Sequence, residues 1–587
     1  MFQGLRFFLR YGWKFDKRYV LWLSLYQLVN ALIPIVATVM PRFIIEELMG
    51  GMRKEKLLLY VGILAGYSLF ATALSAFLRL DSFSRRCAVN TRFDSMLYAR
   101  LIDADYEMLE SPRFLDMQEK AKKFLYCDRH GFGYLLDCAM NIVGQLFTLA
   151  GIAAVVFAMN PLIVLLFAAL AMLGAVVESR AKQRAMRLSM EVVADMRSTQ
   201  YYATLFESYR YGKEIRLNAI GGWLLRRQSA FASRANRNQK RQNDLFIRSR
   251  SIGALLTFVQ QCVSYAYLIG RVMLGAIGIG EFMMYVGAVT AFAAALRAVM
   301  DSLAEIRTYD MYYDELDAYL NVPTAMRRGT LPRAADAPVQ HGIEFKNVGF
   351  RYAGAEAWAL RGIDLTIHAG ERLSVVGENG AGKTTFAKLL CRLYDPTEGA
   401  IYLDGVDIRK IAYDDYMRLL SAVFQDFELF AFSLRDNITL GSPVNDDVLH
   451  AAIRRVGLEE RVRTLPNGLD TAVGRTFDPE GFEPSGGEAQ KIALARSLVK
   501  DAPVILLDEP TAALDPRAEY GMLRQFDALV SGKTAVYISH RLSSARFCDN
   551  IAVFVKGRIA EYGTHAALMA QNGVYAELFR MQAQYYQ

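Results

Sequence analysis

The chain has 587 residues, 53% of them hydrophobic, and a formal net charge of +8. This length exceeds what one hydrophobic core serves, which excludes a single-domain protein. The mean hydropathy of +0.14 is high for a soluble protein and low for one embedded wholly in a membrane, so two unlike parts are expected.

Six apolar runs in the first half of the chain are each long enough to cross a lipid bilayer. A helix of about 20 mostly apolar residues spans the roughly 30 Å of hydrocarbon. The runs are 19–44, 57–80, 138–159, 161–177, 252–270 and 282–300. The alternative, helices buried in a soluble core, usually involves shorter runs that charged residues interrupt. We therefore expect residues 1–320 to form an all-α transmembrane domain with six helices.

Two basic segments, 81–137 and 178–250, separate these apolar runs. The second contains no proline and predicts two long polar helices that project into water. Because cytoplasmic segments of membrane proteins carry an excess of Lys and Arg, both projections and the N-terminus are expected in the cytoplasm. The protein would then be a multi-pass protein of the cell membrane, plasma or inner, and the basic excess indicates a membrane surface and no nucleic-acid partner.

A change of pattern near residue 340 marks a second domain. Prolines at 323, 332 and 338 predict a linker over residues 321–340. From 341 to 587 the periodicity alternates between strands and helices, which indicates an α/β domain. The loop described next makes it a P-loop nucleotide-binding domain by expectation. The predicted strands include 363–367, 373–376 and 504–507, and the predicted helices include 385–393 and 490–499.

A phosphate-binding loop is predicted where one of these strands meets a helix. Gly380 and Gly382 let backbone N–H groups approach a triphosphate without side-chain interference. Lys383 supplies positive charge to the outer phosphates, and the Thr384 hydroxyl is suited to Mg²⁺. The residues expected to bind ATP here are Gly377, Asn379, Gly380, Ala381, Gly382, Lys383, Thr384 and Thr385.

Three further side chains are candidates for catalysis. Asp508 ends an apolar strand and is suited to hold Mg²⁺, and Glu509 beside it could polarise the attacking water as general base. His540 follows another apolar run and could fix the γ-phosphate and that water. The alternative for a lone histidine is a structural role.

These motifs, together with Ser485-Gly486-Gly487 upstream of Asp508, resemble those of ATP-binding cassette (ABC) exporters. The whole chain resembles a half-transporter, in which six transmembrane helices are fused to one nucleotide-binding domain. The resemblance implies that Tyr352 stacks on adenine, unless it is an ordinary strand tyrosine. It also implies that Gln425 contacts Mg²⁺ and takes part in catalysis, and that Asp515 links two ATP sites.

The resemblance further implies a partner. Ser485, Gly486 and Gly487 would bind the γ-phosphate of ATP held by the P-loop of a second half-transporter. Pro484 and Glu488 stand where the family usually has Leu and Gln, and Arg475 stands where it often has Glu. The unchanged centre of the motif favours a homodimer, and a heterodimer stays open. Short helices near 103–111 and 212–219 would contact the nucleotide-binding domains.

The function that the resemblance implies is an ABC-type transport ATPase that exports an amphipathic substrate, such as a peptide, lipid or drug, by alternating access. Polar and aromatic residues within the apolar runs fit such a substrate, and helix packing explains them equally well. They are Tyr26, Gln27, Gln145, Gln260, Gln261, Tyr265 and Tyr267. An importer on the same scaffold, as some siderophore carriers are, and an ATP-gated channel or regulator remain alternatives.

Overall fold

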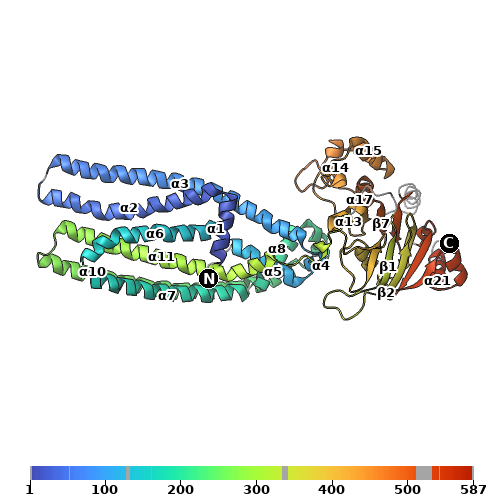
Figure 1. Ribbon diagram of the computed structural model, residues 1–587, viewed down its shortest axis with the longest axis horizontal. Coiled ribbons are helices and arrows are strands. Elements are labelled where there is room, and N and C mark those ends of the chain that lie inside the picture. The colour runs from blue at the N-terminus through green and yellow to red at the C-terminus, as the bar shows by residue number, and fades with distance from the viewer. Residues whose placement is uncertain are drawn as a thin grey trace. The chain divides into compact units, whose positions relative to one another are not determined.

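The computed structural model describes all residues except 1–2, 52, 127–132, 160, 192, 333–340, 511–529, 531, 541 and 585–587. The chain forms two compact units (Figure 1). The first comprises Met1–Ala104 and Ser111–Val322 and is helical. The second comprises Asp105–Glu110 and Pro323–Gln587 and contains all the strands among the described residues.

Long helices that run alongside one another build the first unit. Helix α11 packs on α6, α2 and α7, while α10 packs on α7 and α2 packs on α3. The helices are α1 (Gln3–Phe15), α2 (Lys17–Met49), α3 (Lys54–Asp103), α5 (Pro112–Tyr126), α6 (Gly133–Met159), α7 (Pro161–Glu191), α8 (Val193–Glu207), α9 (Gly212–Leu217), α10 (Gly221–Met273) and α11 (Ile279–Leu320), with the 3₁₀ turn η2 (Tyr209–Tyr211).

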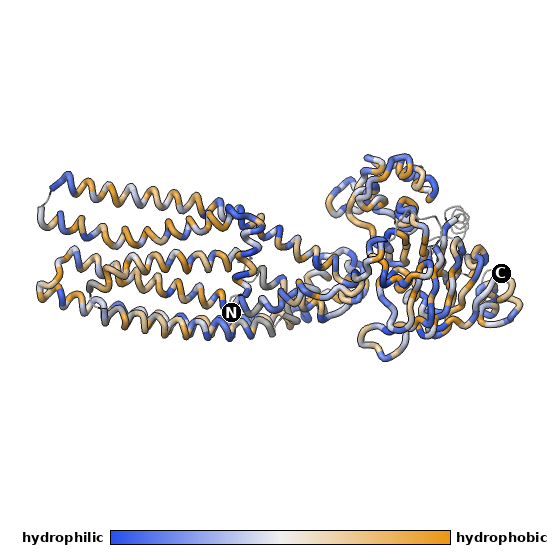
Figure 2. Tube along the Cα trace, in the orientation of Figure 1, coloured by the Kyte–Doolittle hydropathy of each residue, from blue (hydrophilic) through white to orange (hydrophobic). Residues whose placement is uncertain are grey.

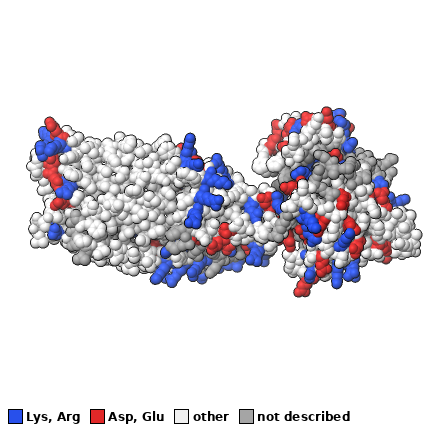
Figure 3. Space-filling model, viewed as in Figure 1, with Lys and Arg blue, Asp and Glu red and all other residues white. Residues whose placement is uncertain are grey.

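Five helical segments of the described part of the chain are long and apolar enough to cross a membrane. They are Lys17–Met49, Lys54–Asp103, Gly133–Phe157, Gly221–Met273 and Ile279–Arg307. Four of them contain one predicted run each, and Gly133–Phe157 overlaps most of the run 138–159. The remaining run, 161–177, lies in α7, some of whose side chains fall outside the described residues. Figure 2 shows these helices as mainly apolar, and Figure 3 shows a broad zone of the unit's visible face that is almost free of charged side chains.

Helix α2 shows how local chemistry sets an element of this unit. The Asp16 carboxylate caps it by accepting hydrogen bonds from the backbone N–H groups of Arg18 and Tyr19, at 2.9 and 3.2 Å. The helix then continues through Pro34 and Pro41, which membrane helices tolerate where neighbouring helices or Ser and Thr side chains satisfy the freed backbone groups.

The polar projections are also helical. The predicted pair of polar helices over 178–250 corresponds to the end of α7 with α8, and to the first half of α10, joined by η2 and α9. Helix α3 continues far beyond the predicted run 57–80, to Asp103. Helix α1 precedes the predicted first span and buries Phe8 against Phe93, with ring centroids 6.0 Å apart.

Two sheets form the second unit. A four-stranded antiparallel sheet has the order β2-β1-β4-β5, and a six-stranded sheet has the order β10-β9-β3-β8-β7-β6, parallel except for the β9–β10 pair. The strands are β1 (Ile343–Phe350), β2 (Leu360–Ile367), β3 (Arg372–Gly377), β4 (Glu398–Leu403), β5 (Val406–Asp407), β6 (Leu420–Val423), β7 (Val504–Asp508), β8 (Thr534–Ile538), β9 (Asn550–Val555) and β10 (Arg558–Gly563).

The helices of this unit are α4 (Tyr106–Leu109), α12 (Lys383–Leu390), α13 (Tyr413–Leu419), α14 (Leu434–Thr439), α15 (Asp446–Arg455), α16 (Glu459–Thr464), α17 (Gly486–Lys500), α19 (Leu542–Ala545), α20 (His565–Gln571) and α21 (Val574–Gln584), with η3 (Met326–Arg328) and η4 (Gly468–Asp470). A helical unit that is followed along the chain by an α/β unit confirms the predicted fold class.

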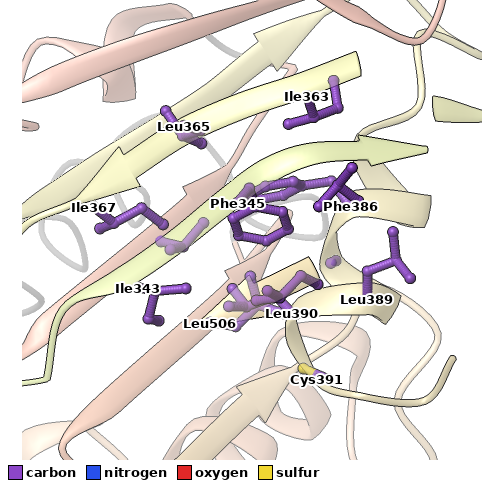
Figure 4. Packing of buried hydrophobic residues seen from close by; sticks show 14 of the residues in the cluster. Ile343, Phe345, Ile363, Leu365, Ile367, Phe386, Leu389, Leu390, Cys391 and Leu506 are labelled. Atoms are coloured by element: carbon purple, nitrogen blue, oxygen red, sulfur yellow. The ribbon is translucent and has the colours of Figure 1, made fainter. Parts of the chain in front are cut away.

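The main core of the second unit surrounds α12 (Figure 4). Phe386 of α12 stacks on Phe345 of β1 at 4.7 Å between ring centroids, and Leu390 and Leu506 complete the contact. The helix was predicted over 385–393 but ends at Leu390, because Arg392 adopts a left-handed conformation with φ of +49°. A second cluster gathers α14, α15 and α17 around β6 and β7.

The short helix α4 belongs to the second unit and lies within the predicted segment 103–111. The carboxylate of Asp105 accepts hydrogen bonds from the backbone N–H groups of Ala325 and Met326, at 2.7 and 3.3 Å. Glu110 pairs with Lys388 at 3.4 Å, which ties α4 to the helix that begins at the P-loop.

Candidate functional site

Four parallel strands bring their carboxyl ends to one edge of the six-stranded sheet. Val423 of β6 pairs with Leu507 of β7, Asp508 pairs with Ile538 of β8, and Ile538 pairs with Val375 of β3. Loops that leave this edge therefore start side by side, as ligand-binding loops do in open parallel sheets. The residues at this edge are Gly377 at the end of β3, Gln425 after β6, Asp508 at the end of β7 with Glu509 directly after it, and His540 after β8.

The P-loop follows β3 and needs glycine where its backbone approaches other chain segments. A Cβ atom at Gly377 would lie 2.3 Å from the carbonyl oxygen of Phe554. At Gly382, whose φ is +106°, a Cβ atom would lie 2.6 Å from Leu360 Cδ2. Gly380 also has a positive φ, of +78°. These glycines hold the loop in a conformation that exposes backbone N–H groups at the start of α12.

Lys383 is folded back into this loop. Its ammonium Nζ donates hydrogen bonds to the carbonyl oxygens of Gly377 and Glu378, both at 2.9 Å, and the residue is buried. Burial lowers the pKa of Lys383, against the opposing charges of Glu509 and Asp508. The ammonium group is thus held by the carbonyl groups of the loop itself.

The remaining loop residues divide between surface and core. Asn379, Gly380 and Thr384 are exposed, whereas Ala381 and Thr385 are buried. The Thr385 hydroxyl lies 3.1 Å from the hydroxyl of Tyr352.

Tyr352 packs in an aromatic group beside α12. Its ring meets Phe350 and Tyr394 edge to face, with centroids 4.9 and 5.5 Å apart, and Lys388 lies 5.8 Å from its centre. The ring is half-buried, so one part of it stays open to a ligand next to the P-loop helix.

Asp508 is a buried carboxylate at the end of β7. Burial, together with the neighbouring charges of Glu509 and Asp426, raises its pKa to about 6 against the opposing charge of Lys383. Gln425, two residues beyond β6, is exposed at the same sheet edge. Asp426, which directly follows Gln425 and contributes to the raised pKa of Asp508, was not among the predicted site residues.

Glu509 and His540 form a direct pair. The imidazole Nε2 of His540 contacts the Glu509 carboxylate, and burial followed by the charge of Lys383 lowers the pKa of His540. Glu509 has φ of +51°, a conformation uncommon for a residue with a side chain, and its N–H donates to the carbonyl of Ile538 at 2.8 Å. The backbone thus aims the carboxylate at the histidine that follows the neighbouring strand β8.

The Ser485-Gly486-Gly487 motif starts α17. The Ser485 hydroxyl caps this helix by accepting from the N–H of Glu488 at 3.3 Å, and the Glu488 carboxylate accepts from the N–H of Ser485 at 2.8 Å. Helix α17 packs in the second core cluster, whereas the P-loop helix packs in the first.

Gln490 lies in α17, which we call the signature helix after the Ser485-Gly486-Gly487 motif at its start. It joins this helix to the residue that follows β7, and sequence reasoning missed it. It is buried, and its side-chain amide donates to the carbonyl oxygen of Glu509 at 3.3 Å. A buried polar residue three positions after the motif gives no local signal of this contact. Asp515 lies outside the described residues.

A separate hollow of about 1070 Å³ opens in the helical unit between α2, α3 and α6. Tyr26 and Gln27 line it, as does Arg79, and Arg86 pairs there with Asp137 at 3.1 Å. The other polar positions predicted for the substrate are not among the residues that line this hollow. Gln145 donates to Asn141 on its own helix at 3.3 Å, Gln260 is buried, and Gln261 and Tyr265 are exposed.

Comparisons with known proteins agree on one family. The sequence model of the family described as "ABC transporter" matches residues 360–512. An "ATP-dependent lipid A-core flippase" of Methylococcus capsulatus (strain Bath) is 32% identical over 473 residues, which are 79% of this chain and 76% of that protein. A subtilin transport ATP-binding protein of Bacillus subtilis is 26% identical over 569 residues, 94% of this chain and 90% of that one.

A solved structure shares the fold of the whole chain. A bacterial Atm1-family ABC exporter with ATP bound matches with a TM-score of 0.74 and 24% identity, and the match covers 97% of this chain and 98% of that one.

Proposed function

Because this chain belongs to the ABC transporter family, as an exporter-type half-transporter with one nucleotide-binding domain, we propose that it exports an amphipathic lipid with an anionic headgroup. It is a multi-pass membrane protein whose ATPase drives transport. The hollow between α2, α3 and α6 carries the proposal about the substrate.

The chemistry of this hollow suits such a lipid. Arg79 offers positive charge to an anionic headgroup, whereas the charge of Arg86 is balanced by Asp137, and Tyr26 and Gln27 offer hydrogen bonds. The hollow also has apolar walls, including Leu23, that suit acyl chains. Charged residues within membrane helices are costly and usually serve a function. Several relatives are named lipid A-core flippases, which also favours a lipid as the substrate. The relative named as a subtilin transport protein favours a peptide as the alternative substrate.

The nucleotide-binding unit provides the driving force. The P-loop N–H groups and the start of α12 would hold the ATP phosphates, and Lys383 would turn from the carbonyls of Gly377 and Glu378 to the outer phosphates. The half-buried ring of Tyr352 would stack on adenine.

A magnesium ion fits the donors at this edge of the sheet. The Thr384 hydroxyl, the Gln425 amide oxygen and the Asp508 carboxylate are hard oxygen ligands of the kind that Mg²⁺ prefers. The raised pKa of Asp508, caused by burial, indicates a carboxylate that lacks sufficient positive charge nearby, which a cation would supply. When bound, the ion would neutralise charge on the phosphates.

Glu509 is proposed as the general base and His540 as the group that holds it. The His540 contact and the φ of +51° at Glu509 fix the carboxylate at the sheet edge. There it would accept a proton from a water aligned with the γ-phosphate, while Gln425 would contact Mg²⁺ and sense the membrane domain.

The working form is proposed as a homodimer. Ser485, Gly486 and Gly487 begin a helix in a different core cluster from the P-loop, which supports their use on a partner's ATP. This chain carries Asp508, Glu509 and His540 as well as the signature centre, so two copies would make two complete sites. To shift a two-state protein from 1:99 to 99:1, ATP must favour the closed state by about 5.5 kcal/mol.

We also propose how the protein is oriented in the membrane and which helices couple its two units. The basic projections and the N-terminus would face the cytoplasm of a cell or inner membrane, by the positive-inside tendency. Helices α4 and α9 would transmit movement between the membrane helices and the nucleotide-binding domains, and the packing of α4 on the second unit supports this for the first of them.

The test uses the full chain in nanodiscs. We expect an anionic, phosphorylated glycolipid to stimulate ATP hydrolysis several-fold more than an uncharged glycolipid with the same acyl chains or a cationic peptide. Arg79→Ala should remove this difference, while Arg271→Ala, an exposed arginine at the end of α10, should keep it. Equal stimulation by both glycolipids, or preference for the peptide, would refute the lipid assignment.

A further inference from the structure

A glutamine of α21, the last helix among the described residues, hydrogen-bonds to the backbone on both sides of position 541, after β8. The side-chain oxygen of Gln582, in α21, accepts a hydrogen bond from the backbone N–H of Leu542 at 2.9 Å. The side-chain nitrogen of the same residue donates to the carbonyl oxygen of His540. One amide thus bridges two backbone positions that follow β8, the second of them at the start of α19.

Helix α21 is fixed firmly enough to make this bridge a restraint. Both oxygens of the Glu561 carboxylate accept hydrogen bonds at its first turn, from Val574 N–H at 2.6 Å and Tyr575 N–H at 3.0 Å. Tyr575 is fully buried, and its hydroxyl lies 2.7 Å from Nδ1 of His565.

A common core cluster joins this helix to both loops of the nucleotide site. Tyr575 packs in it with Val376, the residue before the P-loop glycine Gly377, and with Leu542, which follows the histidine loop. Side chains held by such packing keep functional groups in place to within fractions of an ångström. The helix therefore has a fixed position relative to the strand ends that carry the site.

Gln582 also borders open space beside the P-loop. A hollow of about 230 Å³ is lined by Glu378 and Asn379 on one side and by His540, Leu578 and Gln582 on the other. The contact between Gln582 and His540 is therefore at the nucleotide side of the domain.

We propose that Gln582 is a positioning residue for ATP hydrolysis, which sets the backbone at His540 and through it the side chain that contacts Glu509. The inference rests on the proposed function of Glu509 and His540. His540 can hold Glu509 only if its own backbone is held, and Gln582 supplies two hydrogen bonds for that purpose. A displacement of about 1 Å at such a group lowers rates by up to 10²-fold.

Steady-state ATPase kinetics of the full-length protein in nanodiscs test this. Gln582→Ala should lower kcat by about tenfold, which corresponds to the loss of one or two net hydrogen bonds. The KM for ATP should change less than twofold, because the P-loop contacts remain. Gln584→Ala, an exposed glutamine on the same helix, is the matched control and should leave kcat unchanged.

A double-mutant cycle separates positioning from a merely structural role. In a His540→Ala background, Gln582→Ala should cause no further fall in kcat, because the residue acts only through the histidine. An equal fold-loss in both backgrounds would overturn the proposal, as would an unchanged kcat in the single variant.

A conservative variant covers the case in which Gln582→Ala unfolds the protein. Gln582→Glu keeps the acceptor for Leu542 N–H and loses the donor to the His540 carbonyl, so kcat should fall while the melting temperature stays within a few degrees. Wild-type kcat in this variant would overturn the inference. If the wild-type chain, or its Glu509→Gln variant, fails to behave as proposed, the proposed function fails instead, independently of Gln582.

Discussion

The hydroxyl of Ser485 donates a hydrogen bond to the carboxylate of Glu488 at 2.9 Å, at the start of the signature helix. Glu488 also pairs with Arg461, whose Nε lies 2.9 Å from the other carboxylate oxygen. Burial opposes ionisation of Glu488, but the hydrogen bonds from Ser485 and the charge of Arg461 hold its pKa below the usual value. A negative charge therefore persists at neutral pH next to the hydroxyl proposed to meet a γ-phosphate.

Glu488→Gln should strengthen ATP binding. Gln at this position can still cap Ser485, and the substitution removes a like charge from the phosphate's surroundings. Because the Arg461 pair is partly exposed, the expected decrease in the KM for ATP is modest, about two- to fivefold. Glu459→Gln, which neutralises an exposed carboxylate paired with Arg463, is the control. An equal decrease there, or an increase at Glu488, would contradict the explanation.

Much of this fold follows from local sequence patterns. Apolar runs near 20 residues long predict membrane helices, because a helix of that length is needed to cross a bilayer. A strand that ends at Gly377 and a helix that begins at Lys383, with glycines in the turn between them, predict a P-loop. Such features depend on neighbouring residues, so sequence alone reveals them.

Other parts depend on residues far apart in the chain, and sequence reasoning missed them. The contact of Gln490 with the backbone of Glu509 and the bridge from Gln582 to His540 are examples, because a glutamine in a helix has no pattern that names its partner. Helix α1 was also missed, although the aromatic residues at positions 7, 8, 11 and 15 have helical spacing and surround Phe93. The site residues themselves stay predictions.

Lys383→Ala should weaken nucleotide binding. The buried ammonium group already makes two hydrogen bonds within the loop, and its transfer to phosphate oxygens would replace them with stronger charged ones. Loss of these contacts should raise the Kd of a non-hydrolysable ATP analogue by about ten- to a hundredfold. Lys410→Ala, which removes an exposed charge from the same domain, serves as the control. Unchanged affinity in Lys383→Ala would count against the cradle.

Asp508→Asn should stabilise the nucleotide-free protein at neutral pH. Burial raises the pKa of Asp508 from 3.8 to about 6, so the folded state holds a proton that the unfolded state has lost, and stability falls as the pH rises through this window. The shift corresponds to about 3 kcal/mol above pH 6. The asparagine removes this cost, so the melting temperature should rise by several degrees at pH 7.5 and by less toward pH 5.

The same variant should lose the stabilisation that Mg²⁺ with ATP gives the wild type, because ligand binding to the folded state raises the melting temperature. Asp501→Asn, whose side chain is 82% exposed, should show neither effect. A melting temperature that falls in Asp508→Asn at pH 7.5 would show that the carboxylate stabilises the unliganded fold.

Glu509→Gln should stop turnover while ATP remains bound. The amide has the shape of the carboxylate but cannot accept a proton, so the general-base contribution of about 10²–10⁴ in kcat is lost. The left-handed backbone of Glu509 and the hydrogen bond from its backbone N–H to the carbonyl of Ile538 fix the position of the side chain. Neither feature depends on the carboxylate itself. Nucleotide binding should therefore survive. Trapping of radiolabelled ATP measures this, with Glu480→Gln, an exposed carboxylate in the loop before the signature helix, as control. Rapid steady hydrolysis by Glu509→Gln would remove the assigned base, and failure to retain ATP would mean that Glu509 serves binding instead of the chemical step.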